Sequence, residues 1–495
     1  MDPKLVTSAN WVCGIDRQQQ TSGVRTPRTA TAMNSQDSKS GELPPTEIDL
    51  KEILSKSRHD NETRKSDPGR AFLVAGMLFV TVTALALRLA LLDHSTWDLV
   101  GFSLPRLERI RGTGFWALIA RPFSADEYAP FYTYAIAFAD AIFPRSTDGK
   151  TVIKSVSILF DFATAIMLFA LARLRWDDSR GAVAAYAALL FAPTVVLNGA
   201  YWGQSDIVYT AFLLGCFYFL LRCASIPAIV CFGLGFAFKP QAAWLGPFIL
   251  MLVLRRYIRW WQLALVPGVY LVLALPAVYA GHSWWEVATI YVNSASTLGR
   301  TLNAHTANLY LFLDYLFGRL GLWPESIPVI AALGLALTVA VTILFAWRLA
   351  HSGVDVPSES MVLAALVSVL FVPQCLPHMH ERYFFPADVF AIVLSVWNPA
   401  YWWVAVLMQF NSFVTYIHFL WGPRLMAQPV AGWLAVFGFT NNLQPVTGLV
   451  GIASILNALL LLWLWRVLMS SLKDPAGRIP NVVLLQDSWK LDLGG

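Results

Sequence analysis

The sequence predicts an all-α fold, a polytopic transmembrane bundle of about 11 to 13 helices. Of the 495 residues, 57% are apolar and 14% are charged, and the mean hydropathy is +0.55. A soluble chain of this length needs a more highly charged surface. Apolar runs of roughly 20 residues, long enough to cross the hydrocarbon core of a bilayer, recur from Ala71 onward.

Tryptophan residues lie at the ends of many of these runs, as expected of an interfacial aromatic belt. Packing in the protein core is the alternative for some of them. The belt candidates are Trp97, Trp176, Trp202, Trp260, Trp261, Trp284, Trp285, Trp402, Trp403 and Trp421.

The two ends of the chain differ from its apolar centre. Residues 1–70 are rich in Ser, Thr, Gln, Asp and Lys, so we expect a disordered cytoplasmic tail. The transmembrane domain is expected over residues 71–470, and a cytoplasmic C-terminal tail over residues 471–495. The net charge of +5 forms no basic stripe, so no nucleic-acid partner is expected. The five cysteines show no metal-binding or disulfide pattern.

The expected spans follow one another with short connections. Residues 225–239 and 241–254 form a short pair interrupted by Lys239-Pro240, which indicates tilted or half-buried helices. An amphipathic segment near 308–321 is expected to lie on the membrane. The spans are placed near 71–92, 151–172, 181–199, 205–222, 225–239, 241–254, 262–280, 327–349, 359–376, 383–398, 400–420 and 446–469.

The basic residues in short loops predict the orientation, because such residues favour the cytoplasmic side. With twelve spans, both termini are cytoplasmic, and the large loops 93–150 and 281–326 lie on the opposite, outer face. The basic residues used are Arg64, Lys65, Arg70, Arg173, Arg175, Arg180, Arg222, Arg255, Arg256, Arg259, Arg348, Arg466 and Lys473. The expected location is the plasma membrane of a bacterium or the endoplasmic reticulum of a eukaryote.

Polar motifs gather at this outer face, and the first of them contains Asp98. A carboxyl group just beyond a span is partly desolvated, which favours its use as a proton acceptor near neutral pH. Capping of the following helix is the alternative role for Asp98. In the same loop Asp126, Glu127 and Tyr128 combine carboxylates with an aromatic ring, as carbohydrate sites do, although interfacial capping produces a similar pattern.

Two further motifs lie at span junctions. The segment 198–209 contains Trp202, Gln204 and Asp206, and an acid at the membrane surface is costly unless it is used or paired. Helix capping explains part of this pattern. The segment FAFKPQAAW contains Lys239 and Gln241; Lys239 can pair with Asp206 or a lipid phosphate, or simply reach for the interface.

The densest polar cluster is His378, His380, Glu381 and Arg382, between two apolar spans. Arg382 and the histidines can hold a phosphate by charge-assisted hydrogen bonds and stabilise the charge that develops as a sugar–phosphate bond breaks. A zinc site is the alternative, but the HxHE spacing differs from HExxH. A plain loop is the other alternative.

In order, these motifs resemble membrane-embedded glycosyltransferases of the GT-C class, most closely the Gpi18-like mannosyltransferase group. The similar segments are WGQSD (202–206), KPQ (239–241) and HMHER (378–382). The last also resembles the HxHEK-like segment of dolichyl-phosphate-glucose-dependent transferases. The resemblance covers roughly residues 71–400, and its specificity depends on the order and common side of three short motifs.

The resemblance implies a polyprenyl- or dolichyl-phosphate hexose donor, a catalytic Asp in the first outer loop, and inversion at the anomeric carbon. That Asp corresponds to Asp98. Arg382, His378, His380 and Lys239 are the expected donor-phosphate ligands. No cofactor is expected, and a divalent cation is possible but unsupported, because the loop has adjacent Asp126-Glu127 in place of Asp-x-Asp. The acceptor is a glycan, a lipid or a protein.

Two other classes remain as alternatives. A transporter or flippase would use the same polar residues as a substrate path, but it predicts them near mid-membrane and not at helix ends on one face. A polysaccharide polymerase or ligase with a diphosphate-linked donor would share the architecture and much of the polar chemistry.

Overall fold

The computed structural model describes residues 68–121, 130–176, 179–297, 302–320, 327–352, 358–425 and 447–473. Most of the two expected tails therefore lies outside the described residues. The chain divides into two compact units, residues 1–79 and 80–495. The boundary falls inside α3 (Pro68–Ala90), and the second unit carries the features described below.

The predicted all-α class is confirmed, and among the described residues seven helices are long and apolar enough to cross a membrane. The chain is thus an integral, multi-pass membrane protein. These spans comprise α3, α7 (Gly149–Arg175), η7 (Trp260–Ala264) with α13 (Leu265–Tyr279), α16 (Ile327–Ala350), α17 (Ser358–Cys375), η8 (Pro399–Tyr401) with α19 (Trp402–Leu425), and α21 (Thr447–Ser471).

In the described part of the chain, fewer helices than the expected 11 to 13 are long enough to cross a membrane, because the other expected spans are short or broken. One pair, bent by 48°, raises the count of spans to eight; it consists of α8 (Ser179–Leu190) followed by α9 (Pro193–Val196) and η5 (Leu197–Trp202). The expected spans that form short apolar helices are α10 (Asp206–Leu221), α11 (Ser225–Phe238), η6 (Pro240–Leu245) with α12 (Gly246–Leu254), and α18 (Phe385–Trp397).

The short length of these helices has a physical cause, because polar motifs lie at their ends. At 1.5 Å per residue, a helix of 16 residues such as α10 extends about 24 Å, less than the hydrocarbon thickness of about 30 Å. Lys239 ends α11 because Pro240 disfavours a helical conformation at the residue before it, and Lys239 is extended, at φ −149° and ψ 134°. We therefore expect the polar residues at the ends of these short helices to lie within the thickness of the bilayer.

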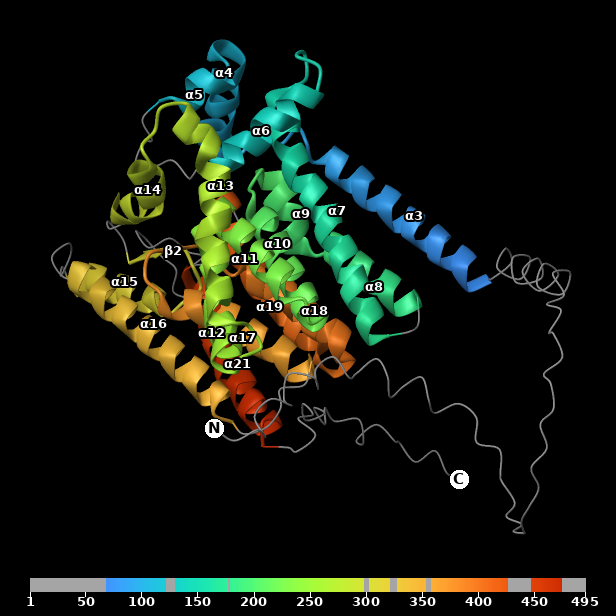
Figure 1. Ribbon diagram of the computed structural model, residues 1–495, viewed down its shortest axis with the longest axis vertical. Helices are drawn as coiled ribbons and strands as arrows, with labels where there is room; N and C mark the ends of the chain where they lie inside the picture. Colours follow the sequence, from blue (N-terminus) through green and yellow to red (C-terminus); the bar gives the residue numbers. More distant parts are fainter. Residues whose placement is uncertain are drawn as a thin grey trace, which may run out of the picture. The chain divides into compact units, whose positions relative to one another are not determined.

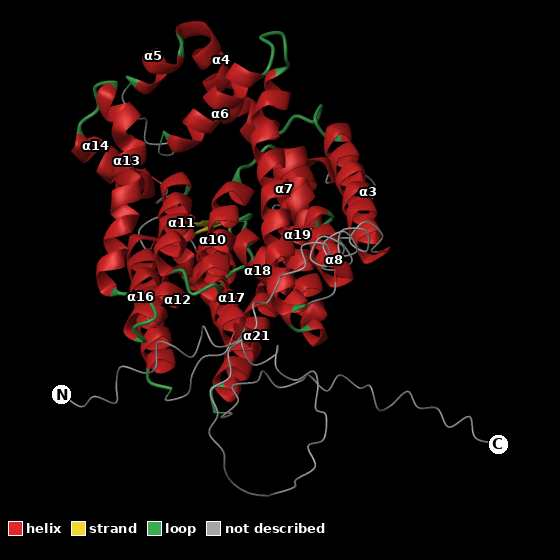
Figure 2. Ribbon diagram, turned by 45° about the vertical axis from the view of Figure 1, so that its right-hand side comes forward, coloured by secondary structure: helices red, strands yellow, loops and turns green. Residues whose placement is uncertain are grey.

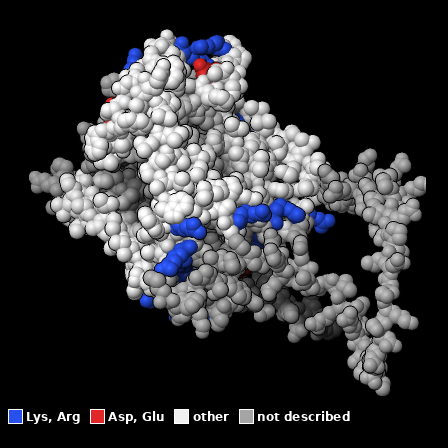
Figure 3. Space-filling view, viewed as in Figure 1, with Lys and Arg blue, Asp and Glu red and all other residues white. Residues whose placement is uncertain are grey.

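A group of shorter helices gathers at one end of the second unit (Figures 1 and 2). Figure 3 shows Lys and Arg at this end, near α4, and again toward the opposite end, with an almost uncharged band between. That band agrees with a surface that faces lipid. The end group comprises η4 (Leu99–Ser103), α4 (Leu104–Thr113), α5 (Phe115–Ile119) and α6 (Phe131–Ile142). The 281–326 segment forms α14 (Trp284–Thr297), β1 (Asn303–Ala304) and α15 (Tyr310–Leu320), and α15 lies beside α16, away from this end (Figure 1).

A buried ion pair fastens the end of α3 to α7. Arg88 Nε lies 2.7 Å from Asp161 Oδ2, and neither side chain is exposed. Arg88 also donates to the carbonyl oxygen of Ala84 at 3.1 Å. A charge inside a membrane span is stable only when it is paired and hydrogen-bonded, so this pair sets the register between the two helices.

Removing one partner of this pair should destabilise the protein strongly. For Asp161→Leu we expect a loss of about 3–5 kcal/mol, because an uncompensated guanidinium remains buried. The double variant Arg88→Met/Asp161→Leu should recover most of the loss. Thermal unfolding in lipid nanodiscs measures both, and equal stability of the single and double variants would show that the pair does not hold the helices together.

Candidate active site

Asp98 lies on the segment that joins α3 to η4. Its Oδ2 atom accepts hydrogen bonds from Trp202 Nε1 at 2.9 Å and Gln204 Nε2 at 2.7 Å. The side chain makes no helix-capping hydrogen bond, which removes the capping alternative, and it is 14% exposed. Asp98 is thus fixed through one carboxylate oxygen while remaining accessible from outside the protein.

The WGQSD segment is built to present these two donors. Gly203 has φ +82°, which disfavours any residue with a side chain, and a Cβ atom there would lie 3.1 Å from Leu99. Trp202 is fully buried and its ring stacks on Phe419 with centroids 5.1 Å apart. The prediction of Trp202 as an interfacial belt residue is therefore wrong, because its indole is buried and donates a hydrogen bond to Asp98.

Asp206 is fully buried and accepts from two neighbours. Lys239 Nζ lies 2.7 Å from Asp206 Oδ1, and Asn198 Nδ2 lies 2.9 Å from Asp206 Oδ2. Lys239 is itself only 5% exposed, so it pairs with Asp206 and does not reach for the interface. Direct contact with a substrate, expected for Asp206, is not available to a side chain so enclosed.

Arg382 lies among three carboxylates. Its Nη1 atom donates to Glu381 Oε1 at 2.6 Å and lies 3.9 Å from Asp98 Oδ2, while its Nε atom lies 3.6 Å from Asp206 Oδ2. Together with Lys239 it gives two cations against three carboxylates. Motifs far apart in the sequence therefore form one charged cluster, which we call the Asp98–Arg382 cluster (Asp98, Asp206, Lys239, Glu381 and Arg382).

Glu381 is ionised within this cluster. Burial raises the pKa of its carboxyl group, but Arg382 and His380 outweigh burial and bring the pKa to about 2. The Thr415 hydroxyl donates to the carbonyl oxygen of Glu381 at 3.0 Å. With 1% exposure, Glu381 holds Arg382 in place and has no surface left for the substrate contact that the sequence suggested.

The two histidines of the HMHER segment lie at the margin of the cluster. Residues Met379–His380 form β2, which pairs in parallel with β1, drawn in yellow in Figure 2. His378 N donates to the carbonyl oxygen of Leu302 at 2.8 Å, and His380 Nδ1 lies 3.7 Å from Glu381 Oε2. Both imidazoles are partly exposed, so a ligand can reach them.

A groove between apolar helices leads to His378. It has a volume of about 730 Å³ and lies between η6, α12, α16 and α17. Leu250, Leu335 and Val372 line its apolar part, and Gln241 and His378 line its polar part. We call this the lateral groove.

The lateral groove reaches the charged cluster through Tyr383. This residue lines the groove, and the guanidinium of Arg382 lies 5.8 Å from the centre of its ring. Gln241, which is 7% exposed, accepts no protein hydrogen bond at Oε1. The polar end of the groove thus offers an unused acceptor, Gln241 Oε1, and Tyr383 links it to the guanidinium of Arg382.

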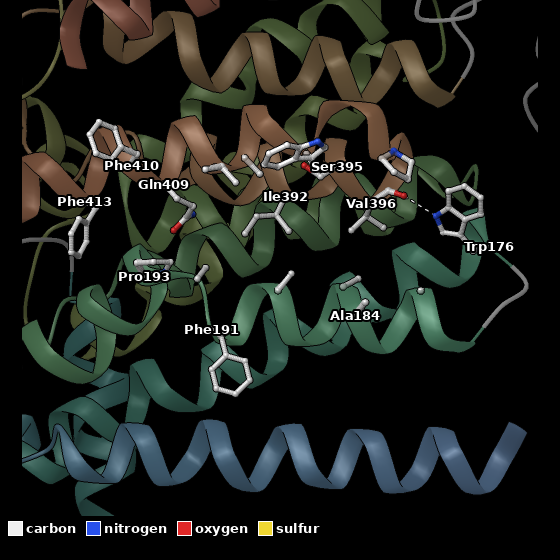
Figure 4. Close-up of a pocket in the computed structure, with 18 residues that line it drawn as sticks. Trp176, Ala184, Phe191, Pro193, Ile392, Ser395, Val396, Gln409, Phe410 and Phe413 are labelled. Carbon is white, nitrogen blue, oxygen red and sulfur yellow. Dashed lines mark hydrogen bonds between the residues drawn. The ribbon is translucent and has the colours of Figure 1, made fainter. Parts of the chain in front are cut away.

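Figure 4 shows a second groove, of about 900 Å³, between α8, α18 and α19. Ala184, Ile392 and Gln409 line it, and Trp176 Nε1 donates to the carbonyl oxygen of Val396 at 2.7 Å near its end. None of the predicted site residues lines this groove, so we assign it no part in the reaction.

Two further predictions concern the acidic motif of the first outer loop and the metal alternative. Asp126, Glu127 and Tyr128 lie outside the described residues. Across the described ranges no three His, Cys, Asp or Glu side chains form a group that could hold a metal ion.

Sequence reasoning missed several charged residues inside the spans. Lys154 and Asp161 in α7, Arg88 in α3 and Asp388 in α18 are all fully buried. Averaged hydropathy hides single charges, but an ionisable residue within an apolar run is itself a signal of a functional or pairing role. Asp388 accepts from the Ser412 hydroxyl at 2.8 Å.

Comparison with known proteins adds two similarities. The family model of dolichyl-phosphate-mannose-protein mannosyltransferases matches residues 127–285, less than half of the chain; this part includes Asp206 and Lys239 but neither Asp98 nor Arg382. The crystal structure of ArnT from Cupriavidus metallidurans bound to undecaprenyl phosphate is similar at 15% identity and a TM-score of 0.46, covering 76% of this chain and 77% of that chain. No curated protein sequence matches the chain.

Proposed function

We propose that the chain is an integral membrane glycosyltransferase that takes a hexose, with mannose favoured, from a polyprenyl- or dolichyl-phosphate donor. One observation carries the proposal. The partly exposed carboxylate of Asp98 lies 3.9 Å from Arg382, and Arg382 in turn lies next to Tyr383 at the polar end of the lateral groove. The partial match to the mannosyltransferase family model supports the sugar and the donor class.

The lateral groove suits the lipid part of such a donor. Its apolar walls accept isoprenoid units at a gain of roughly 25 cal/mol per Å² of buried apolar surface. The phosphate of the sugar donor then lies near His378 and His380, whose partly exposed imidazoles can donate hydrogen bonds to it. Because the carboxylates of the cluster already engage Arg382 and Lys239, the histidines supply the additional hydrogen bonds that a phosphate needs.

In the proposed reaction the acceptor hydroxyl attacks the anomeric carbon of the sugar. A carbon–oxygen bond to the acceptor forms, the bond from that carbon to the donor phosphate breaks, and the configuration inverts. Asp98 takes the acceptor proton as general base, through the carboxylate oxygen that Trp202 and Gln204 do not occupy. Arg382 and the histidines stabilise the charge on the departing phosphate.

A transporter remains the second candidate, because buried charges do occur inside the spans. Arg88 and Asp161 neutralise each other, and Lys154 is fully hydrogen-bonded to backbone carbonyls. Buried charges whose partners are all within the protein favour a structural role in helix packing over a role in a transport path. The decisive assay supplies labelled polyprenyl-phosphate-mannose and -glucose to the purified protein in vesicles with a panel of glycan, lipid and peptide acceptors. Uptake of the label without transfer would favour the transporter.

Filling the lateral groove should weaken donor binding selectively. Ala332 lines the groove on α16, so Ala332→Trp should raise the KM for a long-chain donor about tenfold, which corresponds to about 1.4 kcal/mol of binding free energy. A short-chain, water-soluble donor should be affected much less. The matched control is Leu333→Trp, since Leu333 on the same helix is 65% exposed and does not line the groove. Equal effects on both donor lengths would place the lipid elsewhere.

A further inference from the structure

One face of α7 carries a polar residue on nearly every turn. Lys150, Lys154, Ser157 and Asp161 follow one another at spacings of three and four, so they project from the same side of the helix. We call them the α7 polar stripe. Three of the four are fully buried within a helix that is otherwise apolar enough to span a membrane, which requires that each polar group have a partner.

Lys154 uses all three of its donors on the turn that follows α3. Its ammonium group donates to the carbonyl oxygens of Leu91 at 3.0 Å, Leu92 at 2.9 Å and His94 at 2.8 Å. These carbonyls lie just beyond the last turn of α3, which ends at Ala90, and a cation near a helix C-terminus also complements the helix dipole. A lysine has three donors, so this ammonium is fully engaged in fixing the chain at the end of α3.

The segment that Lys154 fixes leads directly to Asp98. The Thr96 hydroxyl donates to the carbonyl oxygen of Trp202 at 2.8 Å. On the other side, the Ser157 hydroxyl donates to the carbonyl oxygen of Gln204 at 2.6 Å. The α7 polar stripe therefore touches both the segment that carries Asp98 and the segment that carries the two hydrogen-bond donors of Asp98.

We propose that Lys154 is a positioning residue that places the Asp98 carboxylate for the transfer step. This inference rests on the proposed function, because it assumes that Asp98 acts as the base. A displacement of about 1 Å in a reacting group can lower the rate about 100-fold, and supporting hydrogen bonds are what hold such a group in place. Lys154 acts through backbone carbonyls and does not itself meet the substrate.

The first test is the kinetics of Lys154→Met in full-length protein in lipid. Methionine keeps the length of the side chain without its donors, and we expect kcat to fall about 10- to 100-fold with a donor KM within about twofold of wild type. Lys154→Gln, which retains two donors, should fall between, and it also serves if Lys154→Met does not fold.

The matched control is Lys150→Met, on the preceding turn of the same stripe. Lys150 is 22% exposed and donates to one carbonyl oxygen, that of Asp93 at 3.1 Å, so its removal should leave kcat near wild type. An unchanged kcat in Lys154→Met, or an equal loss in both variants, would overturn the proposal.

A second readout does not depend on activity. Trp97, next to Asp98, is 71% exposed, so a nitroxide attached at Trp97→Cys, with the native cysteines replaced, reports on the mobility of this segment. We expect a more mobile nitroxide with Lys154→Met and no change with Lys150→Met. If wild type transfers no sugar but the nitroxide responds as expected, the proposed function fails while the positioning holds. An immobile nitroxide in Lys154→Met would refute the positioning itself.

Discussion

Replacing Asp98 by Asn is expected to abolish sugar transfer while the protein stays folded and binds its donor. The substitution keeps an oxygen that can accept from Trp202 and Gln204, the two donors that hold Asp98 at 2.9 and 2.7 Å. An amide cannot take the proton of the acceptor hydroxyl. Loss of a general base lowers a rate by typically about 10²- to 10⁴-fold, and we expect the upper part of this range.

The measurement is the turnover of labelled polyprenyl-phosphate hexose, together with the affinity for the unreacted donor. Asp93→Asn is the matched control, because Asp93 stands on the same segment with an exposed side chain and contributes its carbonyl oxygen to Lys150. That variant should transfer sugar at the wild-type rate. Wild-type turnover in Asp98→Asn would assign the base elsewhere and leave Asp98 as a ligand of Arg382.

The long helices were accessible to sequence analysis because their signal is simple. In α16 and α21, apolar runs exceed 20 residues, and length with hydropathy suffices to place them. The helices around the site gave weaker signals. Lys239-Pro240 divides α11 from η6, and its pairing with Asp206 depends on how two short helices pack, which hydropathy cannot measure.

The site was predictable in its members more than in its geometry. The sequence placed Asp98, Asp206, Lys239 and Arg382 on the same side of the membrane and so in one predicted site. In the structure, distances of 2.7 to 3.9 Å bring these four side chains together. Which residue is exposed could not be predicted, because burial depends on the packing of several helices. Lys154 was missed for the same reason, since a lysine next to a span end resembles one that reaches for the interface.

Replacing Arg382 by Gln is expected to cause the second large loss, in both donor affinity and transfer. The guanidinium stands between Asp98, Asp206 and Glu381, so the variant loses the proposed phosphate ligand and also leaves carboxylates that Lys239 alone must balance. Removing one group that stabilises transition-state charge costs about 10²- to 10³-fold in kcat. Stability should fall by about 3–5 kcal/mol, as for other broken buried pairs.

These two effects of Arg382→Gln can be separated by pH and by a second substitution. In wild type the pKa of Glu381 is about 2, below its usual value of 4.5, so its stabilising contribution is present above about pH 5 and lost as the pH falls toward 2. Without Arg382, burial dominates and the pKa of Glu381 rises; the variant should therefore regain stability as the pH is lowered from 7 toward 5, whereas wild type should not. The double variant Arg382→Gln/Glu381→Gln restores the wild-type net charge of the cluster and should therefore restore the melting temperature.

Donor affinity in this double variant separates the two roles of Arg382. If Arg382 binds the donor phosphate, donor affinity will stay low in the double variant, whereas recovery of affinity would mean that Arg382 only neutralises its carboxylate neighbours.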